Sequence, residues 1–399
     1  MSSGGLSKAR LARLHEVMAG HVTRGDMPGL VTLVGRRDEV HVDAIGMLAA
    51  GGSEPMRRDT IFRIASMTKP ITAAAAMILV EECRLRLDEP VDALLPELAD
   101  RKVLKSLGSK LDDTVPAHRP ITLRDLLTFR LGFGAIMEPP GRYPIQAAME
   151  EAGLAPSAEV PQVTSDIWMQ RLGTLPLIHQ PGEKWLYHTG SDILGVLIAR
   201  AAGQRLEDFL RERLFEPLGM KDTGFHVPAD KLDRLAPGYR VDPETRRLAL
   251  NDSVAESRWG RSPAFQSGGG GLVSTAEDYF AFYRMMLNKG RYGRERILSR
   301  PSVELMTTDQ LTPEQKAGAR IFFGDNRGWG FGLSVFTRRD DLSAVPGRFG
   351  WDGGFGTSAY ADPRENLIGI LLTQRMMESP EPPKVFLDFW TSAYQAIDD

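Results

Sequence analysis

The chain has 399 residues, of which 42% are hydrophobic and 25% are charged, so it can bury a large core and is too apolar for general disorder. Its 49 basic and 52 acidic residues leave a formal charge of −3, and this balance argues against a nucleic-acid-binding protein, which needs excess positive charge. The single cysteine, Cys83, excludes an intramolecular disulfide, and we expect it to be a small buried hydrophobe.

The N-terminal segment has no continuous apolar stretch of the kind that forms the core of a secretory signal. Its apolar residues instead recur at approximately helical spacing among charges, which predicts a surface helix; they are Leu6, Ala9, Leu11, Leu14 and Val17. The longest apolar run, residues 71–80, is too short to span a bilayer. We therefore expect a cytoplasmic protein without a membrane partner.

Strand and helix signals alternate in blocks along the chain. Two segments rich in β-branched residues, 29–34 and 40–47, flank a charged turn and predict an antiparallel hairpin. The long middle section predicts helices, the clearest at 72–82, 123–128, 192–202, 206–214 and 276–288. Strand signals return at 329–337, 358–362 and 366–374, and a final helix is expected at about 383–397.

Strands at both ends and helices in the middle indicate an α+β fold. The simplest arrangement joins the two ends into one mostly antiparallel sheet flanked by the terminal helices. This predicts a sheet domain made of residues 1–65 and 327–399, with residues 66–326 as a mainly helical inserted domain. The active site is then expected at the junction of the two domains.

The first motif with catalytic potential is Ser66-Met67-Thr68-Lys69, at the start of an apolar helix. Residues three apart share a helical face, so Lys69 can approach the Ser66 hydroxyl. A serine hydroxyl is a poor nucleophile until a base removes its proton, and lysine is a base only when burial or another cation lowers its pKa. On its own, the same pattern also fits a serine N-cap followed by a surface lysine.

The second motif places Tyr187 between the segment 181–186 (PGEKWL) and a helix. A tyrosine hydroxyl has an ordinary pKa of about 10, so it becomes a base only where a cation stabilises the phenolate. Lys69 could supply that cation. Tyr187 alone could equally be a packing aromatic, but together with Ser66 and Lys69 it is better explained as part of a catalytic group.

The third motif is the sequence GWDGG at 350–354, between two of the late strands. Glycines on an edge strand let a ligand approach the backbone closely, and a backbone N–H there could pair with that of Ser66 to form an oxyanion hole. Without the other motifs, a glycine-rich hairpin turn explains the same residues.

These motifs resemble, in order and approximate spacing, those of the serine β-lactamase and penicillin-binding-protein superfamily. Connecting segments at 126–128, 181–186, 215–222 and 269–278 are also similar, so the resemblance covers roughly residues 25–375. Within the superfamily the chain looks most like the family VIII carboxylesterases, relatives of class C β-lactamases. The resemblance implies a β-lactamase-like fold, Ser66 as nucleophile, Lys69 and Tyr187 as a general-base pair, and the amides of Ser66 and Gly354 as the oxyanion hole. Which member of the pair takes the proton stays open.

Two departures from the superfamily pattern bear on the substrate. Thr189 stands where β-lactamases of this branch carry the asparagine of Tyr-x-Asn, and Trp351 stands where they carry the lysine of Lys-Thr-Gly. The resemblance to esterases that replace this lysine implies a carboxylesterase acting on short-chain esters. A β-lactamase, a D-amino-acid peptidase, an acyltransferase and a slowly deacylating acyl-binding protein remain alternatives.

The least regular part of the middle section, residues 129–161, combines five prolines with several large apolar side chains: Phe129, Phe133, Met137, Tyr143 and Met149. These side chains either wall an acyl pocket or pack within their own domain. As substrate contacts we expect Phe129 and Phe133, together with Trp351, Gly353 and His188, the last as a pocket-wall or structural residue.

Other reaction classes lack their patterns. No G-x-S-x-G is present, which argues against a Ser-His-Asp hydrolase, and no phosphate-binding glycine loop is found. C-x-x-C, H-E-x-x-H and carboxylates at ligand spacing are also missing. We expect no metal and no organic cofactor, and a small-molecule ester as substrate, with no nucleic-acid or membrane partner. The sequence carries no information on oligomeric state.

Overall fold

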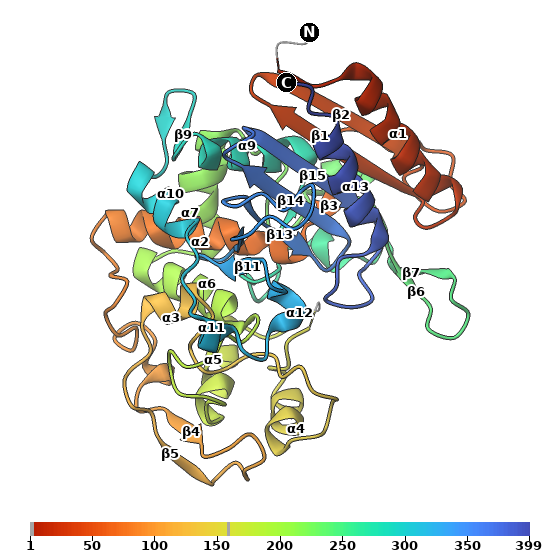
Figure 1. Ribbon diagram of the computed structural model, residues 1–399. Coiled ribbons are helices and arrows are strands. Elements are labelled where there is room, and N and C mark those ends of the chain that lie inside the picture. The colour runs from red at the N-terminus through yellow and green to blue at the C-terminus, as the bar shows by residue number, and fades with distance from the viewer. Residues whose placement is uncertain (1–3, 158–159) are drawn as a thin grey trace.

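In the computed structural model, which describes residues 4–157 and 160–399, the two ends of the chain meet in one seven-stranded antiparallel sheet (Figure 1). The strand order is β11-β12-β13-β14-β15-β1-β2. The strands are β1 (Gly29–Arg36), β2 (Glu39–Gly46), β11 (Arg327–Trp329), β12 (Ser334–Phe336), β13 (Phe349–Gly353), β14 (Thr357–Asp362) and β15 (Leu367–Thr373). The α+β class and the sheet built from both ends are confirmed.

The predicted N-terminal hairpin is present and lies at one edge of the sheet. Arg36 of β1 pairs with Glu39 of β2 across a tight turn, in which Arg37 takes a left-handed conformation. On its other side β1 pairs with β15, from Leu30 opposite Thr373 onward. This pairing is the seam between the two ends of the chain.

Helices cover both faces of the sheet, which is why β1 and β15 are buried along their whole length. On one face lie the terminal helices α1 (Lys8–Thr23) and α13 (Lys384–Gln395), and on the other lies α9 (Ala276–Leu287) (Figure 1). Side chains alternate accordingly: Leu30 and Val34 pack toward the terminal helices, whereas Val31 and Leu33 join the central core.

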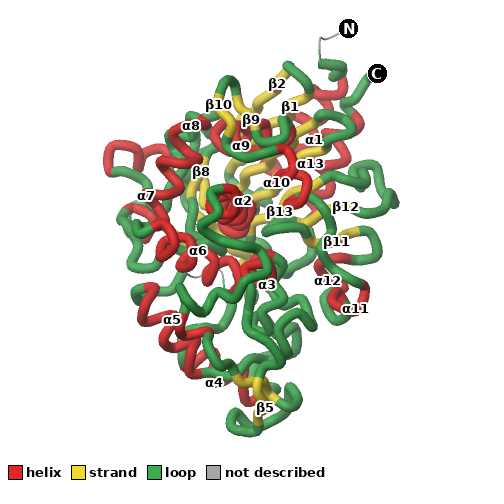
Figure 2. Tube along the Cα trace, turned by 90° about the vertical axis from the view of Figure 1, so that its left-hand side faces the viewer, coloured by secondary structure: helices red, strands yellow, loops and turns green. Residues whose placement is uncertain are grey.

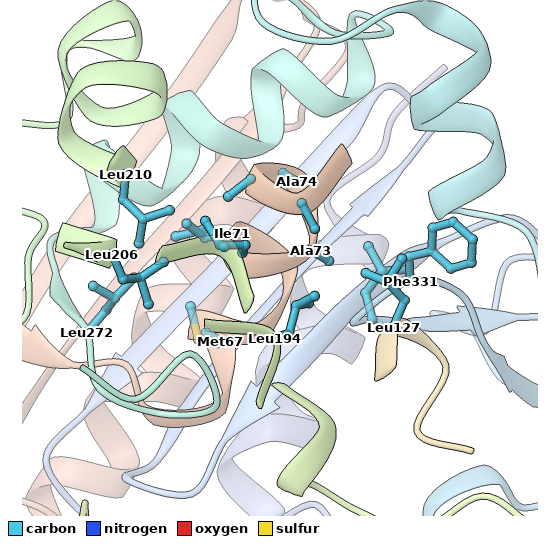
Figure 3. Packing of buried hydrophobic residues seen from close by; sticks show 14 of the residues in the cluster. Met67, Ile71, Ala73, Ala74, Leu127, Leu194, Leu206, Leu210, Leu272 and Phe331 are labelled. Carbon is cyan, nitrogen blue, oxygen red and sulfur yellow. The ribbon is translucent and has the colours of Figure 1, made fainter. Parts of the chain in front are cut away.

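The central core is organised around α2 (Thr68–Glu81), which is seen end-on in the middle of the molecule in Figure 2. Nearly every side chain of α2 is buried, so the helix is apolar all round rather than amphipathic. Its first turns pack against α6 (Thr189–Ala202) through Leu194 and against Phe331 of the sheet region (Figure 3). A helix held on all sides gives its N-terminus a fixed position.

The other elements surround this core. The remaining helices are α3 (Leu123–Leu127), α4 (Pro144–Glu151), α5 (Ser165–Thr174), α7 (Leu206–Leu210), α8 (Glu216–Leu218), α10 (Arg300–Met306), α11 (Pro313–Lys316) and α12 (Arg320–Phe323). Short 3₁₀ segments are η1 (Ala65–Met67), η2 (Pro96–Leu98), η4 (Ala229–Arg234) and η5 (Arg258–Gly260), and η3 (Arg211–Phe215) is a short π segment. Short two-stranded ladders pair β3 (Phe62–Arg63) with β8 (Val273–Ser274), β4 (Lys102–Leu104) with β5 (Thr114–Pro116), β6 (Gly238–Val241) with β7 (Leu248–Asp252), and β9 (Arg291–Tyr292) with β10 (Glu295–Arg296).

Four sequence expectations differ from the structure. The single strand expected at 329–337 is a hairpin of β11 and β12, because Gly332 turns the chain in a left-handed conformation. The helix expected at 206–214 is interrupted, since α7 continues as a π turn, η3, before α8. The irregular segment 129–161 contains the helix α4; residues 158 and 159 of that segment lie outside the described residues. Cys83 is exposed rather than buried, because it follows the end of α2 in a left-handed conformation.

The division into domains at residues 65 and 327 stays a prediction. One helix assigned to the inserted part, α9, packs directly on the sheet. For membrane association, no helix within residues 4–157 and 160–399 combines the length and apolar character needed to cross a bilayer.

Candidate active site

Ser66 lies in the turn η1, immediately before α2. The preceding residue, Ala65, has φ of 43°, a left-handed conformation that non-glycine residues avoid unless the surroundings hold it. The start of α2 is clamped by its neighbours, since the Tyr279 hydroxyl donates to Met67 O at 2.7 Å and Thr72 donates to Gly268 O at 2.8 Å. The half-buried Ser66 side chain is therefore fixed at the positive end of a buried helix.

Lys69 is the second residue of α2; its side chain is buried and reaches back to Ser66. Its Nζ donates to Ser66 Oγ at 2.9 Å and to the carbonyl oxygen of Gly269 at 2.5 Å. Burial lowers the pKa of Lys69 to about 7, and the charge of Asp192 only partly opposes that shift. A lysine with this pKa is neutral in a large share of molecules at neutral pH, so it can accept a proton from Ser66.

Tyr187 lies two residues before α6 and meets the same serine from the other side. Its hydroxyl is hydrogen-bonded with Ser66 and accepts a hydrogen bond of 2.7 Å from Trp351 Nε1. Lys69 Nζ lies 4.6 Å from the centre of the Tyr187 ring. Burial raises the pKa of Tyr187 above its ordinary value, despite these two hydrogen bonds. The lowered tyrosine pKa that the sequence reasoning required is not found, and the opposite shifts favour Lys69 as the proton acceptor.

Asp192 is a buried carboxylate that the sequence reasoning did not single out. Its Oδ1 accepts a hydrogen bond of 2.6 Å from Ser267 Oγ and one of 3.1 Å from Gly269 N. The same Gly269 peptide accepts the Lys69 hydrogen bond through its oxygen, so Asp192 holds the group that orients the lysine. Burial raises the pKa of Asp192. Its place one turn into α6, five residues after Tyr187, was the only available signal.

His188 separates Tyr187 from α6 and lines the cleft described below. Its buried Nδ1 has no hydrogen-bond partner among the described residues and lies 3.8 Å from Asp192 Oδ2, too far for a hydrogen bond. Burial, and then the charge of Lys69, hold the pKa of His188 well below its ordinary value. A neutral imidazole in this place fits a wall residue and does not supply a Ser-His-Asp arrangement.

The GWDGG segment forms β13 and the start of its turn toward β14. A side chain at Gly353 would meet Ile64 O at 2.4 Å, so only glycine lets β13 approach the backbone before Ser66 this closely. Thr357 reinforces the contact by donating to Ile64 O at 3.3 Å. Gly354 follows at the cleft, with open space beside its Cα. Its amide and that of Ser66 are thus on adjoining segments, as an oxyanion hole requires.

The edge-strand expectation for this motif needs correction. β13 lies inside the sheet, but β12 pairs with it only at Phe349 and Gly350. On that side no strand of the described chain pairs with Trp351, Asp352 or Gly353, so β13 behaves locally as an edge strand. The hairpin-turn alternative holds only for the residues after Gly353.

These residues open into one cleft with a volume of about 580 Å³. Ser66, Tyr187, His188, Trp351 and Gly354 line it. Its remaining wall is mostly apolar and includes Met137, Val160, Pro161, Ile321, Phe322, Met376 and Met377. Gly353 does not line the cleft, but it lets β13 lie close to the backbone that precedes Ser66.

Two expected substrate contacts lie elsewhere. Phe129 and Phe133 are completely buried and do not line the cleft. The Phe129 ring packs behind Tyr187, with ring centres 5.8 Å apart, and against Trp329 at 4.9 Å. Phe129 therefore supports the site from behind and Phe133 belongs to the central core, whereas the apolar wall includes Phe322 and the methionines.

The described part of the chain contains no cluster of side chains that could bind a metal ion. Within residues 4–157 and 160–399, no three histidine, cysteine, aspartate or glutamate side chains gather to hold an ion. The arrangement that is present contains a positioned serine, a lysine with a lowered pKa, a tyrosine hydroxyl and two backbone amides on adjoining segments. It can carry out nucleophilic acyl transfer.

Fold and site together define a serine hydrolase of β-lactamase-like fold. The chain belongs to the Beta-lactamase family, whose model matches residues 14–386. It is 41% identical to Protein Rv1367c of Mycobacterium tuberculosis, over 88% of this chain and 86% of that protein. It is 30% identical to Esterase EstB of Burkholderia gladioli, over 93% of this chain and 92% of the relative.

A solved structure gives the same picture. EstCE1, described as a hydrolase with promiscuous acyltransferase activity, superposes with a TM-score of 0.80 at 25% identity, over 97% of this chain and 99% of that one. The chain thus falls in the esterase and acyltransferase branch of the serine β-lactamase and penicillin-binding-protein superfamily.

Proposed function

We propose that this protein is a carboxylesterase that cleaves carboxylic esters through a covalent acyl-enzyme on Ser66. The observation that carries the proposal is the contact of Lys69 Nζ with Ser66 Oγ at 2.9 Å, together with a lysine pKa lowered to about 7. This pairs a nucleophile with a base at neutral pH. The similarity to Esterase EstB supports the choice of esters.

In the proposed reaction, Ser66 Oγ attacks the ester carbonyl carbon while its proton passes to Lys69. The amides of Ser66 and Gly354 hold the oxygen that becomes negative. The C–O bond to the alcohol breaks, and the alcohol leaves with the proton that Lys69 took, relayed by the Tyr187 hydroxyl. Water then attacks the acyl carbon and gives a proton to the same groups, the bond between the acyl carbon and Ser66 Oγ breaks, and Oγ takes that proton as the acid leaves.

Trp351 supports esters over β-lactams as substrates. Its indole N–H is already used on the Tyr187 hydroxyl, and its ring packs against Trp329 at 4.8 Å between ring centres. An indole offers no positive charge to the ring carboxylate of an antibiotic. The missing charge-assisted contact is worth about 1.5–3 kcal/mol, or one to two powers of ten in rate constant.

The test compares purified enzyme on a 4-nitrophenyl butyrate ester, a penicillin and a cephalosporin. We expect kcat/KM for the ester to exceed that for either antibiotic by at least about a hundredfold, and Ser66→Ala to abolish the ester reaction. Faster hydrolysis of the cephalosporin than of the butyrate would replace the esterase proposal by a β-lactamase.

Acyl transfer is a second activity that the comparisons favour, because EstCE1 is described as a hydrolase with promiscuous acyltransferase activity. The same acyl-enzyme would then pass its acyl group to an alcohol instead of water. Adding a primary alcohol to the butyrate assay should yield the new butyrate ester. If only free butyrate forms at every alcohol concentration, the second activity is wrong and the esterase proposal stands.

A further inference from the structure

The charged side chains that line the cleft differ in whether they have a hydrogen-bonding or ion-pairing partner. Each of the described carboxylates there has its own donors: Asp192 has a serine hydroxyl and a backbone amide, Asp352 has the hydroxyls of a serine and a tyrosine, and Glu378 has two arginines. The cation among them is Arg327, the first residue of β11. In the described chain no carboxylate lies within ion-pair distance of its guanidinium.

The Arg327 side chain is held in place by an aromatic ring. Its guanidinium lies 4.6 Å from the ring centre of Phe336, the residue with which it pairs across the β11–β12 hairpin. Arg327 is half-buried, so the ring covers part of a group that is only weakly hydrated. A partly desolvated arginine without an anion can bind one at a small desolvation cost.

Arg327 and Asp352 line the same cleft as Ser66. The Arg327 charge opposes the burial-driven rise in the pKa of Asp352, the residue next to Trp351. Beyond Gly350, β12 no longer pairs with β13, and Trp351, Asp352 and Arg327 all line the cleft. A substrate bonded at Ser66 therefore lies in the same, mostly apolar cleft as Arg327.

We propose that Arg327 forms an anionic subsite that binds a carboxylate at the far end of the substrate, so that the preferred substrates are esters carrying a free carboxylate on an apolar chain. This inference rests on the proposed esterase function and names its substrate class. The planar guanidinium can hold a carboxylate through two parallel hydrogen bonds. The cleft volume of about 580 Å³ leaves room for such a chain.

The experiment uses aryl monoesters of adipic, suberic and sebacic acids, each beside its aryl methyl diester, which has nearly the same shape without the charge. Aryl release gives kcat/KM for wild type, Arg327→Gln and Arg338→Gln. Arg338 is the matched control, since it follows β12, is 60% exposed and pairs with Asp340 outside the cleft.

We expect wild type to prefer the monoester at one chain length at least. Arg327→Gln should lower kcat/KM for that monoester at least about tenfold more than for its diester, the loss expected for one charge-assisted contact. Arg338→Gln should change neither. Equal losses on monoester and diester, or no monoester preference at any length, would overturn the subsite.

A binding measurement separates this inference from the esterase proposal. If wild type releases aryl alcohol from none of the esters, the esterase proposal fails, and calorimetry then decides the subsite. Intact monoester should bind Ser66→Ala at least about tenfold more tightly than Ser66→Ala/Arg327→Gln. Equal Kd values would overturn the subsite whatever the catalytic result.

Discussion

Lys69 and Arg348 are both buried cations beside aromatic rings, but Lys69 adjoins the cleft and Arg348 does not. Lys69 lies 4.6 Å from the ring centre of Tyr187, beside the nucleophile. On the other face of the sheet, Arg348 is completely buried, 3.8 Å from the ring centre of Trp390 and 4.4 Å from that of Tyr360. Both sites combine a cation, a tyrosine and a tryptophan.

The two cations differ in whether they can lose a proton. A lysine can lose its proton when burial lowers its pKa, as it does for Lys69, whereas arginine stays charged in proteins. Arg348 instead donates to Ser343 O at 2.5 Å and packs the sheet onto α13. The comparison shows that similar side chains serve chemistry in one place and cohesion in the other, according to whether the cation can be neutral.

The largest effect is expected on activity, when Lys69 is replaced by arginine, the residue type found at position 348. Lys69→Arg keeps the positive charge but removes the base, so ester kcat/KM should fall by at least about a thousandfold. Lys69→Met, which fits the space without a charge, should fall as far. Steady-state kinetics on a butyrate ester, with thermal unfolding to show that each variant folds, measures this. Retained activity in the arginine variant would show that Lys69 does not accept the Ser66 proton.

Replacing Arg348 should lower the stability of the protein rather than its activity. Arg348→Ala removes a side chain packed on four aromatic rings, and the free energy of unfolding should fall by about 3 kcal/mol. Below the unfolding transition, ester kcat/KM should stay within about threefold of wild type. Chemical denaturation and kinetics on the same preparation measure both. A large loss of turnover in folded protein would contradict the structural role.

The smallest effect is expected on the pH dependence of kcat/KM, which the pKa of Lys69 sets. Lys69 acts as a base only when neutral, so kcat/KM should rise with pH through about 7. The Asp192 charge raises the lysine pKa, so Asp192→Asn should move this rise to lower pH, by roughly one unit or less. Asp278→Asn, in another buried aspartate away from Lys69, is the control. A rise that moves upward would show that the Asp192 charge does not act as inferred.

Much of the fold could be predicted because its signals are local. The hairpin 29–46 has strand composition on both sides of a charged turn, and the catalytic motif lies at the start of an apolar helix. The grouping of Ser66, Lys69 and Tyr187 was implied by the family resemblance, and the structure brings the three together.

What escaped prediction depends on tertiary contacts. Asp192 and Ser267 are 75 residues apart, and no local pattern links them. Phe129 was expected at the substrate because aromatic side chains suit both a pocket and a core, and composition does not distinguish the two. Likewise, the open backbone of β13 follows from where β12 ends, which the single strand expected at 329–337 concealed.

The central claim is that Ser66 carries the acyl group, and covalent labelling tests it most directly. The protein is treated with an aryl phosphonate ester, digested and mapped by mass spectrometry, beside Ser66→Ala and a Ser191→Ala control on α6. We predict one phosphonyl group per chain, on the peptide containing Ser66, in wild type and Ser191→Ala, and none in Ser66→Ala. Stoichiometric labelling of another residue, with Ser66→Ala still labelled and active, would contradict the account.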